Sequence, residues 1–114
     1  MLTMDALKEF GANTEEGLGR CFGNEALYLK LVGMIPGEAK FDQLKEAVAN
    51  ADLASAFEAA HALKGVLGNL SLDPIYKPVS EVTELLRARE EADYASYVDE
   101  ILAKRDELVR MIGG

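Results

Sequence analysis

Hydrophobic residues recur at steps of three and four positions along nearly the whole chain, which is the spacing of one face of an α-helix. No stretch shows the two-residue alternation that is typical of a half-buried strand. Capping and turn-forming residues divide the pattern into successive helical segments. We expect these segments at 4–10, 14–22, 25–35, 38–49, 53–70, from 74 into the charged stretch 87–91, and at 94–112. The sequence therefore predicts an all-α fold.

Most of these segments follow a residue whose side chain can accept a hydrogen bond from the first helical turn. The expected N-caps are Thr3, Asn13, Asn24, Asp52, Asp73 and Asp93. The start at Asp73 has the strongest signal, because Pro74 follows it at the first helical position. Gly11 is expected to close the first helix, and the pair Pro36-Gly37 to break the chain before the longer segments.

The breaks between the longer segments are short, and short connections join helices that lie antiparallel to each other. We therefore predict an up-and-down antiparallel four-helix bundle over residues 37–114. The shorter helical pieces of residues 1–36 are expected to pack across one end or one side of it. The length of 114 residues fits a single domain. Because each apolar stripe can be used inside the bundle, we expect a monomer.

The periodicity also predicts which residues face the core. They are Leu27, Leu31 and Ile35 in the third segment, Phe41, Leu44 and Val48 in the fourth, Leu53, Ala56, Ala60, Leu63, Leu67 and Leu70 in the fifth, Ile75, Val79, Val82 and Leu86 in the sixth, and Tyr94, Tyr97, Ile101, Leu108 and Ile112 in the last.

Composition and charge exclude several classes of function. Hydrophobic residues make up 49% of the chain and charged residues 28%, which favours a packed core. Twelve Lys and Arg against 20 Asp and Glu give a formal charge of −8, which argues against binding to nucleic acid or to an anionic membrane. The single cysteine, Cys21, allows no intramolecular disulfide and no cysteine zinc site, and we expect it to be buried. Nothing resembles a signal peptide or a membrane span, so a cytoplasmic protein is expected.

The fifth segment carries the only histidine of the chain, His61. At about 100° per residue, His61 falls roughly 140° from the centre of the apolar stripe, so it should be exposed. Lys64, Gly65 and Gly68 are expected near it on the same side. Each glycine inside a helix costs about 1 kcal/mol relative to alanine. A surface that another protein must approach closely would explain both glycines.

An exposed, neutral imidazole is a good nucleophile near neutral pH, so it can take up a phosphoryl group as a phosphoramidate. Lys64 is placed to stabilise the transferred oxygens. Glu58, one turn before His61, is the only acidic residue nearby; it can orient the ring or act only as a solvated surface residue. A single histidine is a poor basis for a metal site, and no metal or other cofactor is expected in this chain.

The run AHALKGVLGNL (residues 60–70) resembles the phosphoacceptor motif of histidine-containing phosphotransfer (HPt) domains, and the stretch GNEALY (residues 23–28) looks like the family's helix leading into the bundle. The resemblance implies His61 as phosphoacceptor and Lys64 as its charge partner. It further implies room for a docking receiver domain at Gly65 and Gly68, and a place for Asn69 in the docking surface or the helix end. Arg87 falls where some members carry a basic residue facing the site.

The same resemblance implies a phosphorelay intermediate of two-component signal transduction. It would take a phosphoryl group from the phospho-aspartate of one response-regulator receiver domain and pass it to the aspartate of another; a hybrid histidine kinase is a further expected partner. Magnesium would belong to the receiver. No nucleotide-binding loop is present, so the chain is not expected to be an autonomous kinase.

Three other interpretations remain. The His61 face could be a docking module that carries no phosphate, and the two glycines could serve close helix packing. An enzyme with His61 as general base would need an orienting carboxylate and a substrate pocket, and an exposed helix face is expected to offer neither. The residues Val66, Ser71 and Leu72 depart from the family's usual small residues, which affects the end of the helix and the choice of partner.

Overall fold

A computed structural model describes residues 2–113, and none of them is in a strand, which confirms the all-helical prediction. The elements are α1 (Met4–Phe10), α2 (Thr14–Arg20), α3 (Glu25–Gly33), the 3-10 turn η1 (Ile35–Gly37), α4 (Lys40–Ala49), α5 (Leu53–Asn69), α6 (Asp73–Arg87) and α7 (Tyr94–Gly113). None of these helices is long and apolar enough to cross a membrane.

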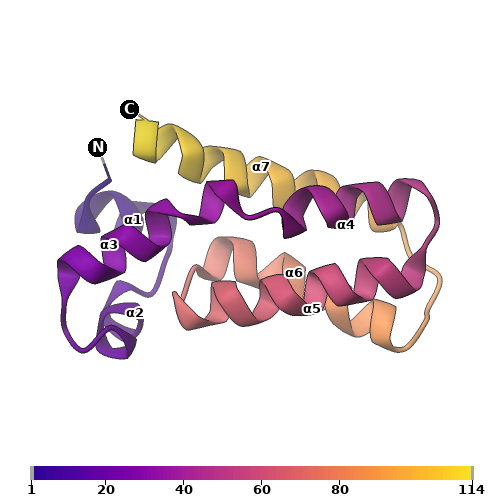
Figure 1. Cartoon of the computed structure of the whole chain (residues 1–114), viewed down its shortest axis with the longest axis horizontal. Coiled ribbons are helices and arrows are strands. Elements are labelled where there is room, and N and C mark those ends of the chain that lie inside the picture. The colour runs from indigo at the N-terminus through magenta and orange to yellow at the C-terminus, as the bar shows by residue number, and fades with distance from the viewer. Residues whose placement is uncertain (1, 114) are drawn as a thin grey trace.

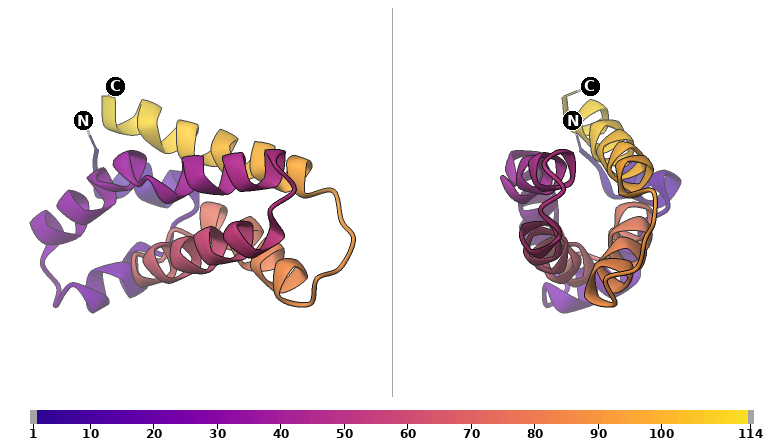
Figure 2. Two further views of the ribbon diagram at one scale, coloured as in Figure 1. Left: turned by 45° about the vertical axis from the view of Figure 1, so that its right-hand side comes forward. Right: turned by 90° about the vertical axis from the view of Figure 1, so that its right-hand side faces the viewer.

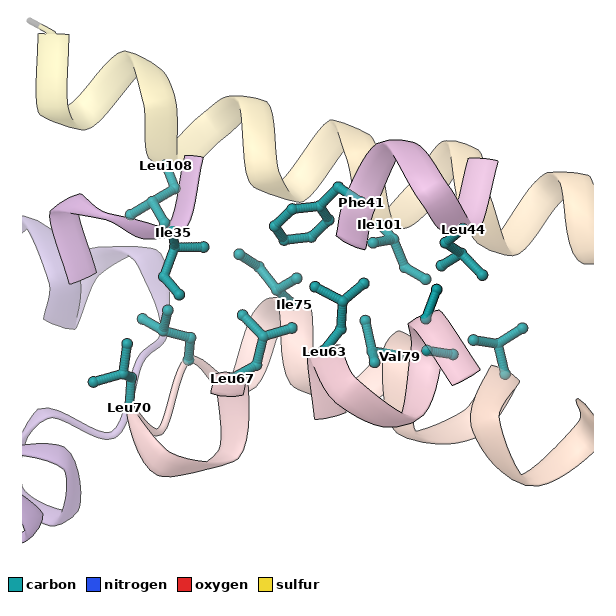
Figure 3. Packing of buried hydrophobic residues seen from close by; sticks show 14 of the residues in the cluster. Ile35, Phe41, Leu44, Leu63, Leu67, Leu70, Ile75, Val79, Ile101 and Leu108 are labelled. Carbon is teal, nitrogen blue, oxygen red and sulfur yellow. The ribbon is translucent and has the colours of Figure 1, made fainter. Parts of the chain in front are cut away.

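The four longest helices surround a common core. α4 packs on α5, α5 on α6, α6 on α7, and α7 again on α4. Consecutive helices run in opposite directions (Figure 1), and the view along the long axis shows them arranged in a ring (Figure 2, right). Phe41, Leu63, Ile75 and Ile101 are fully buried between them and point toward one another (Figure 3).

Local capping fixes where most helices begin. Side-chain oxygens of Thr3, Asn13, Asn24 and Asp52 accept the backbone N–H three residues later, and Asp93 does the same for Ser96, as predicted. The start of α6 differs from the prediction, because the helix begins at Asp73 itself. The carbonyl of the buried Leu72 closes its first turn by accepting the Tyr76 N–H over 2.8 Å.

The short helices α1–α3 lie at the end of the ring where α5 turns into α6 (Figure 1). Tyr28 of α3 joins these short helices to the end of α5, because its fully buried hydroxyl donates a hydrogen bond to the Leu70 carbonyl over 2.8 Å. Burial, with smaller contributions from the nearby Cys21 and Asp73, raises the pKa of Tyr28 to about 12. Cys21 is buried, as predicted.

The predicted core face of the segment 25–35 is correct only at Ile35, which lies in η1; α3 itself turns a different face toward the core. Tyr28, Val32 and Ile35 are buried, whereas Leu27 is exposed and Leu31 is half-buried. The Tyr28 hydroxyl requires this rotation, because it must reach Leu70 across the interface. The periodicity alone could not identify the face, since α3 is apolar on several sides.

Other boundaries and faces also differ from the prediction: α3 ends at Gly33, and Leu53, Tyr97 and Ile112 are only half-buried. α2 ends at Arg20, because Phe22 takes up a left-handed conformation (φ 58°) that leaves the helix. α4 begins at Lys40, after an extended Glu38 whose carboxylate accepts the Lys40 N–H. On α4, Ala47 is buried and Val48 is only half-buried.

Candidate functional site

His61 lies in the middle turns of α5. One face of this helix is apolar and packs on the core, and the other faces solvent. Ala56, Ala60, Leu63 and Leu67 are fully buried, whereas His61 is exposed, as the helical arithmetic predicts. The burial of that apolar face fixes the rotation of the helix, so the core determines that the imidazole faces outward.

A surface cavity of about 450 Å³ opens beside the imidazole. It is lined by Glu16, Arg20, His61, Lys64, Gly65, Gly68, Asn69, Asp73 and Tyr76. Five of the predicted site residues therefore meet at one cavity. Arg87 is not in its lining; it lines a separate cavity with Phe57 and Glu58.

Lys64 and Arg87 share one carboxylate, that of Glu84 on α6. Lys64 Nζ lies 3.3 Å from Glu84 Oε1, and Arg87 Nε lies 3.1 Å from Glu84 Oε2. Hydrogen bonds from Lys64 and then from Arg87 hold the pKa of the Glu84 carboxyl below its usual value. Glu84 and Arg87 are exposed and Lys64 is half-buried. Ion pairs at the surface contribute about 0–1 kcal/mol each, so Lys64 can leave Glu84 for another anion at little cost.

Phe57, which was not predicted as a site residue, connects His61 to Arg87. Its ring stacks on the imidazole with centroids 5.6 Å apart and an angle of 15° between the planes. The Arg87 guanidinium lies over the same phenyl ring, 5.1 Å from its centroid. The spacing of four residues between Phe57 and His61 was the available signal, because residues at that spacing meet on a helix.

The two glycines of the motif occupy different environments. A Cβ on Gly65 would meet nothing within 4 Å, so the space above it is open to an approaching molecule. A Cβ on Gly68 would lie 3.2 Å from the ring of Tyr76 on α6, so Gly68 allows this ring to pack closely. The sequence left two explanations open for the glycines, access to His61 and close helix packing. In the structure, Gly65 leaves room for access, and Gly68 allows the packing.

Asn69 is the last residue of α5; it is exposed and lies at the edge of the cavity. Glu58 is exposed and lines two other cavities, neither of which has His61 in its lining. No hydrogen bond joins Glu58 to His61 among the described residues. Within residues 2–113, no three His, Cys, Asp or Glu side chains come together as a possible metal site.

The arrangement offers an accessible nucleophile, two cationic side chains that line the same cavity, and an open approach. Among residues 2–113, no carboxylate is hydrogen-bonded to the imidazole, as a general base of the catalytic-triad kind would need. These features suit the transfer of a group from one macromolecule to another.

The model of one protein family, described as the Hpt domain, matches residues 37–112. This span covers helices α4 to α6 in full and nearly all of α7, and it includes His61, Lys64 and Arg87. Comparison with curated proteins and with solved structures gave no match.

Proposed function

The chain belongs to the Hpt domain family, whose members carry out histidine phosphotransfer in phosphorelay systems, and we propose that His61 is its phosphoacceptor. One observation carries the proposal. The only histidine of the chain stands exposed beside a cavity, with Lys64 and the open surface of Gly65 next to it.

The proposed reaction moves a phosphoryl group from a receiver aspartate to His61. The lone pair of an unprotonated ring nitrogen attacks phosphorus and forms the N–P bond. The P–O bond of the acyl phosphate breaks, and its electron pair leaves with the aspartate carboxylate. The phosphoimidazolium then loses the proton of its other ring nitrogen to solvent. Transfer to the aspartate of a second receiver runs these steps in reverse.

Lys64 and Arg87 have different roles in this proposal. Lys64 turns from Glu84 toward the phosphoryl oxygens, where a positive charge stabilises the transition state. Arg87 acts at a distance from the cavity, since it holds Phe57 in place against the imidazole. Phe57 thereby restricts the ring of His61 to one plane before the receiver arrives.

The ring of helices α4–α7 corresponds, in this proposal, to the four-helix bundle of the family, and residues 1–36 to an addition outside it. The start of the family match at residue 37 supports this division. The mutual packing of α4, α5, α6 and α7 supports it as well, because the apolar faces are used within one chain, as a monomer requires.

The proposed partners are response-regulator receiver domains and a hybrid histidine kinase. Gly65, Gly68 and Asn69 would lie under the docked receiver, which would bring its own magnesium ion. The chain would be a carrier and not a kinase by itself. A cytoplasmic location stays a prediction from the sequence.

The test is transfer from a phosphorylated receiver domain to the wild-type chain and to His61→Gln in parallel. We expect acid-labile, base-stable label on the wild type and none on the variant. Binding of the unphosphorylated receiver is measured for both chains. If both bind a receiver and neither takes label, the chain is the docking module considered above; label on His61→Gln would show that the acceptor is another residue.

A further inference from the structure

Helix α2 lies outside the span that the family model matches, yet it forms one wall of the cavity beside His61. Glu16 and Arg20 of α2 line this cavity together with His61 and Lys64 of α5. The four long helices alone would leave this side of the cavity open. The N-terminal helices therefore add charged groups to the surroundings of the candidate acceptor.

Several contacts hold α2 against the turn between α5 and α6. The Asn13 N–H donates to the Ser71 carbonyl over 3.0 Å, and Ser71 Oγ donates to Glu16 Oε1 over 3.1 Å. Ser71 is buried in a left-handed conformation (φ 52°), which is unfavourable for a residue with a side chain. The Tyr28 ring covers Gly17 so closely that a Cβ there would lie 2.6 Å from it. These contacts fix which side of α2 faces the cavity.

Arg20 and Lys64 are both paired with carboxylates. Arg20 Nη2 lies 3.0 Å from Glu16 Oε1, and Lys64 Nζ lies 3.3 Å from Glu84 Oε1. The side chains of Arg20 and Glu16 are each about half exposed, and exposed pairs of this kind contribute only about 0–1 kcal/mol. If Arg20 leaves, Glu16 keeps Asn13 and Ser71 as hydrogen-bond donors. Arg20 is therefore free to exchange its partner at low cost.

We propose that Arg20 binds the phosphoryl group carried by His61, as a second cation opposite Lys64; this rests on the proposed function of His61. A phosphoryl group adds between one and two negative charges near neutral pH and offers three acceptor oxygens. The planar guanidinium of Arg20 can donate two parallel hydrogen bonds to such a group, which a lysine cannot do. The N-terminal helices would thus complete an anion-binding site that the four long helices begin.

The test uses phosphoramidate, a small-molecule donor that phosphorylates histidine with release of ammonia, so that no receiver is needed. Phosphorylation on His61 leaves the other ring nitrogen free to take up a proton, and this protonation is followed by the 31P chemical shift as a function of pH. A cation bound to the phosphoryl group disfavours the protonated ring and lowers the midpoint of this titration. We expect Arg20→Gln to raise the midpoint by about half a pH unit, because the site is solvent-exposed.

Three further variants set the scale. Lys64→Gln gives the effect of removing a cation that lies on the same helix as His61. Arg20→Lys keeps the charge and should return the midpoint most of the way to the wild-type value. Arg110→Gln, at an exposed position of α7 outside the cavity lining, changes the net charge equally and should leave the midpoint unchanged.

The outcomes separate the two proposals. A wild-type chain that is phosphorylated on His61, with the same midpoint in Arg20→Gln and Arg110→Gln, overturns the role of Arg20 and leaves the acceptor intact. A wild-type chain that takes no phosphoryl group on His61 overturns the acceptor, and the role of Arg20 with it. Circular dichroism of Arg20→Gln shows that a shifted midpoint comes from a folded protein.

Discussion

The two faces of α5 obey different requirements. The inner face holds Ala56, Ala60, Leu63 and Leu67, all fully buried, whereas the outer face holds His61, Lys64 and Gly65 with weak, exposed ion pairs and open space. Substitutions on the inner face should change stability, and those on the outer face should change transfer. The core thus serves the outer face only by fixing the rotation of the helix.

The largest expected effect comes from truncation on the inner face. Leu63→Ala removes a fully buried side chain, which costs about 2–5 kcal/mol of the free energy of unfolding. Chemical denaturation measures this loss. Transfer to the fraction that stays folded should be nearly normal; a complete loss of transfer in folded Leu63→Ala would mean that the faces are not separable.

The two glycines provide a matched pair on one helix. Gly65→Gln fills open space above the helix, so the free energy of unfolding should not fall, while transfer from a receiver should drop about tenfold, equivalent to about 1.4 kcal/mol.

Gly68→Ala is the control for that variant, because its Cβ would meet Tyr76 at 3.2 Å. We expect this close contact to cancel the stability that alanine would gain through its higher helix propensity. We expect transfer to stay largely unchanged. The comparison fails if Gly68→Ala reduces transfer as much as Gly65→Gln does.

The junction with the N-terminal helices should respond to alkaline pH. The pKa of Tyr28 is raised to about 12 in the folded chain, so the unfolded chain loses this proton first. The raised pKa of Tyr28 therefore adds to the free energy of unfolding below pH 10, and this contribution is lost as the pH rises toward 12. Wild type should therefore lose stability over this range more steeply than Tyr28→Phe.

At lower pH, Tyr28→Phe leaves the Leu70 carbonyl without its donor, which costs about 1–3 kcal/mol. Denaturation at pH 8, 10 and 11 measures both effects. Parallel curves for the two proteins above pH 10 would mean that Tyr28 ionises as easily in the folded chain as in the unfolded one.

The smallest expected effect lies on the outer face, at Phe57. Phe57→Leu keeps an apolar side chain but removes the ring that stacks on His61, so the rate of phosphorylation should fall several-fold at unchanged affinity for the receiver. Rapid-quench kinetics and binding measurements separate the two quantities. Phe57→Tyr retains the ring and should retain the rate; a purely structural role would lower the stability without changing the rate of the folded protein.

Sequence periodicity was sufficient for α5 and α6, where one strong apolar stripe leaves a single way to bury the helix. The predicted face of α6, with Ile75, Val79 and Val82, is buried. It was insufficient for α3, because the hydrogen bond from Tyr28 to Leu70 spans 42 residues and leaves no local pattern.

The candidate site shows the same division. His61, Lys64 and Gly65 lie on one helix, so their proximity followed from spacing alone. The parts that come from other elements could not be found in this way. Glu84 on α6 and Arg20 on α2 approach the site only through tertiary packing, and the Phe57–Arg87 contact likewise joins two helices.

The most direct test of the central claim is a relay in two steps. The chain is first phosphorylated by one receiver, purified, and then mixed with a second, unphosphorylated receiver. We predict that the label leaves His61 and appears on the second receiver as an acyl phosphate. Label that never reaches the chain, or that stays on it in the presence of every receiver that binds, would contradict the account.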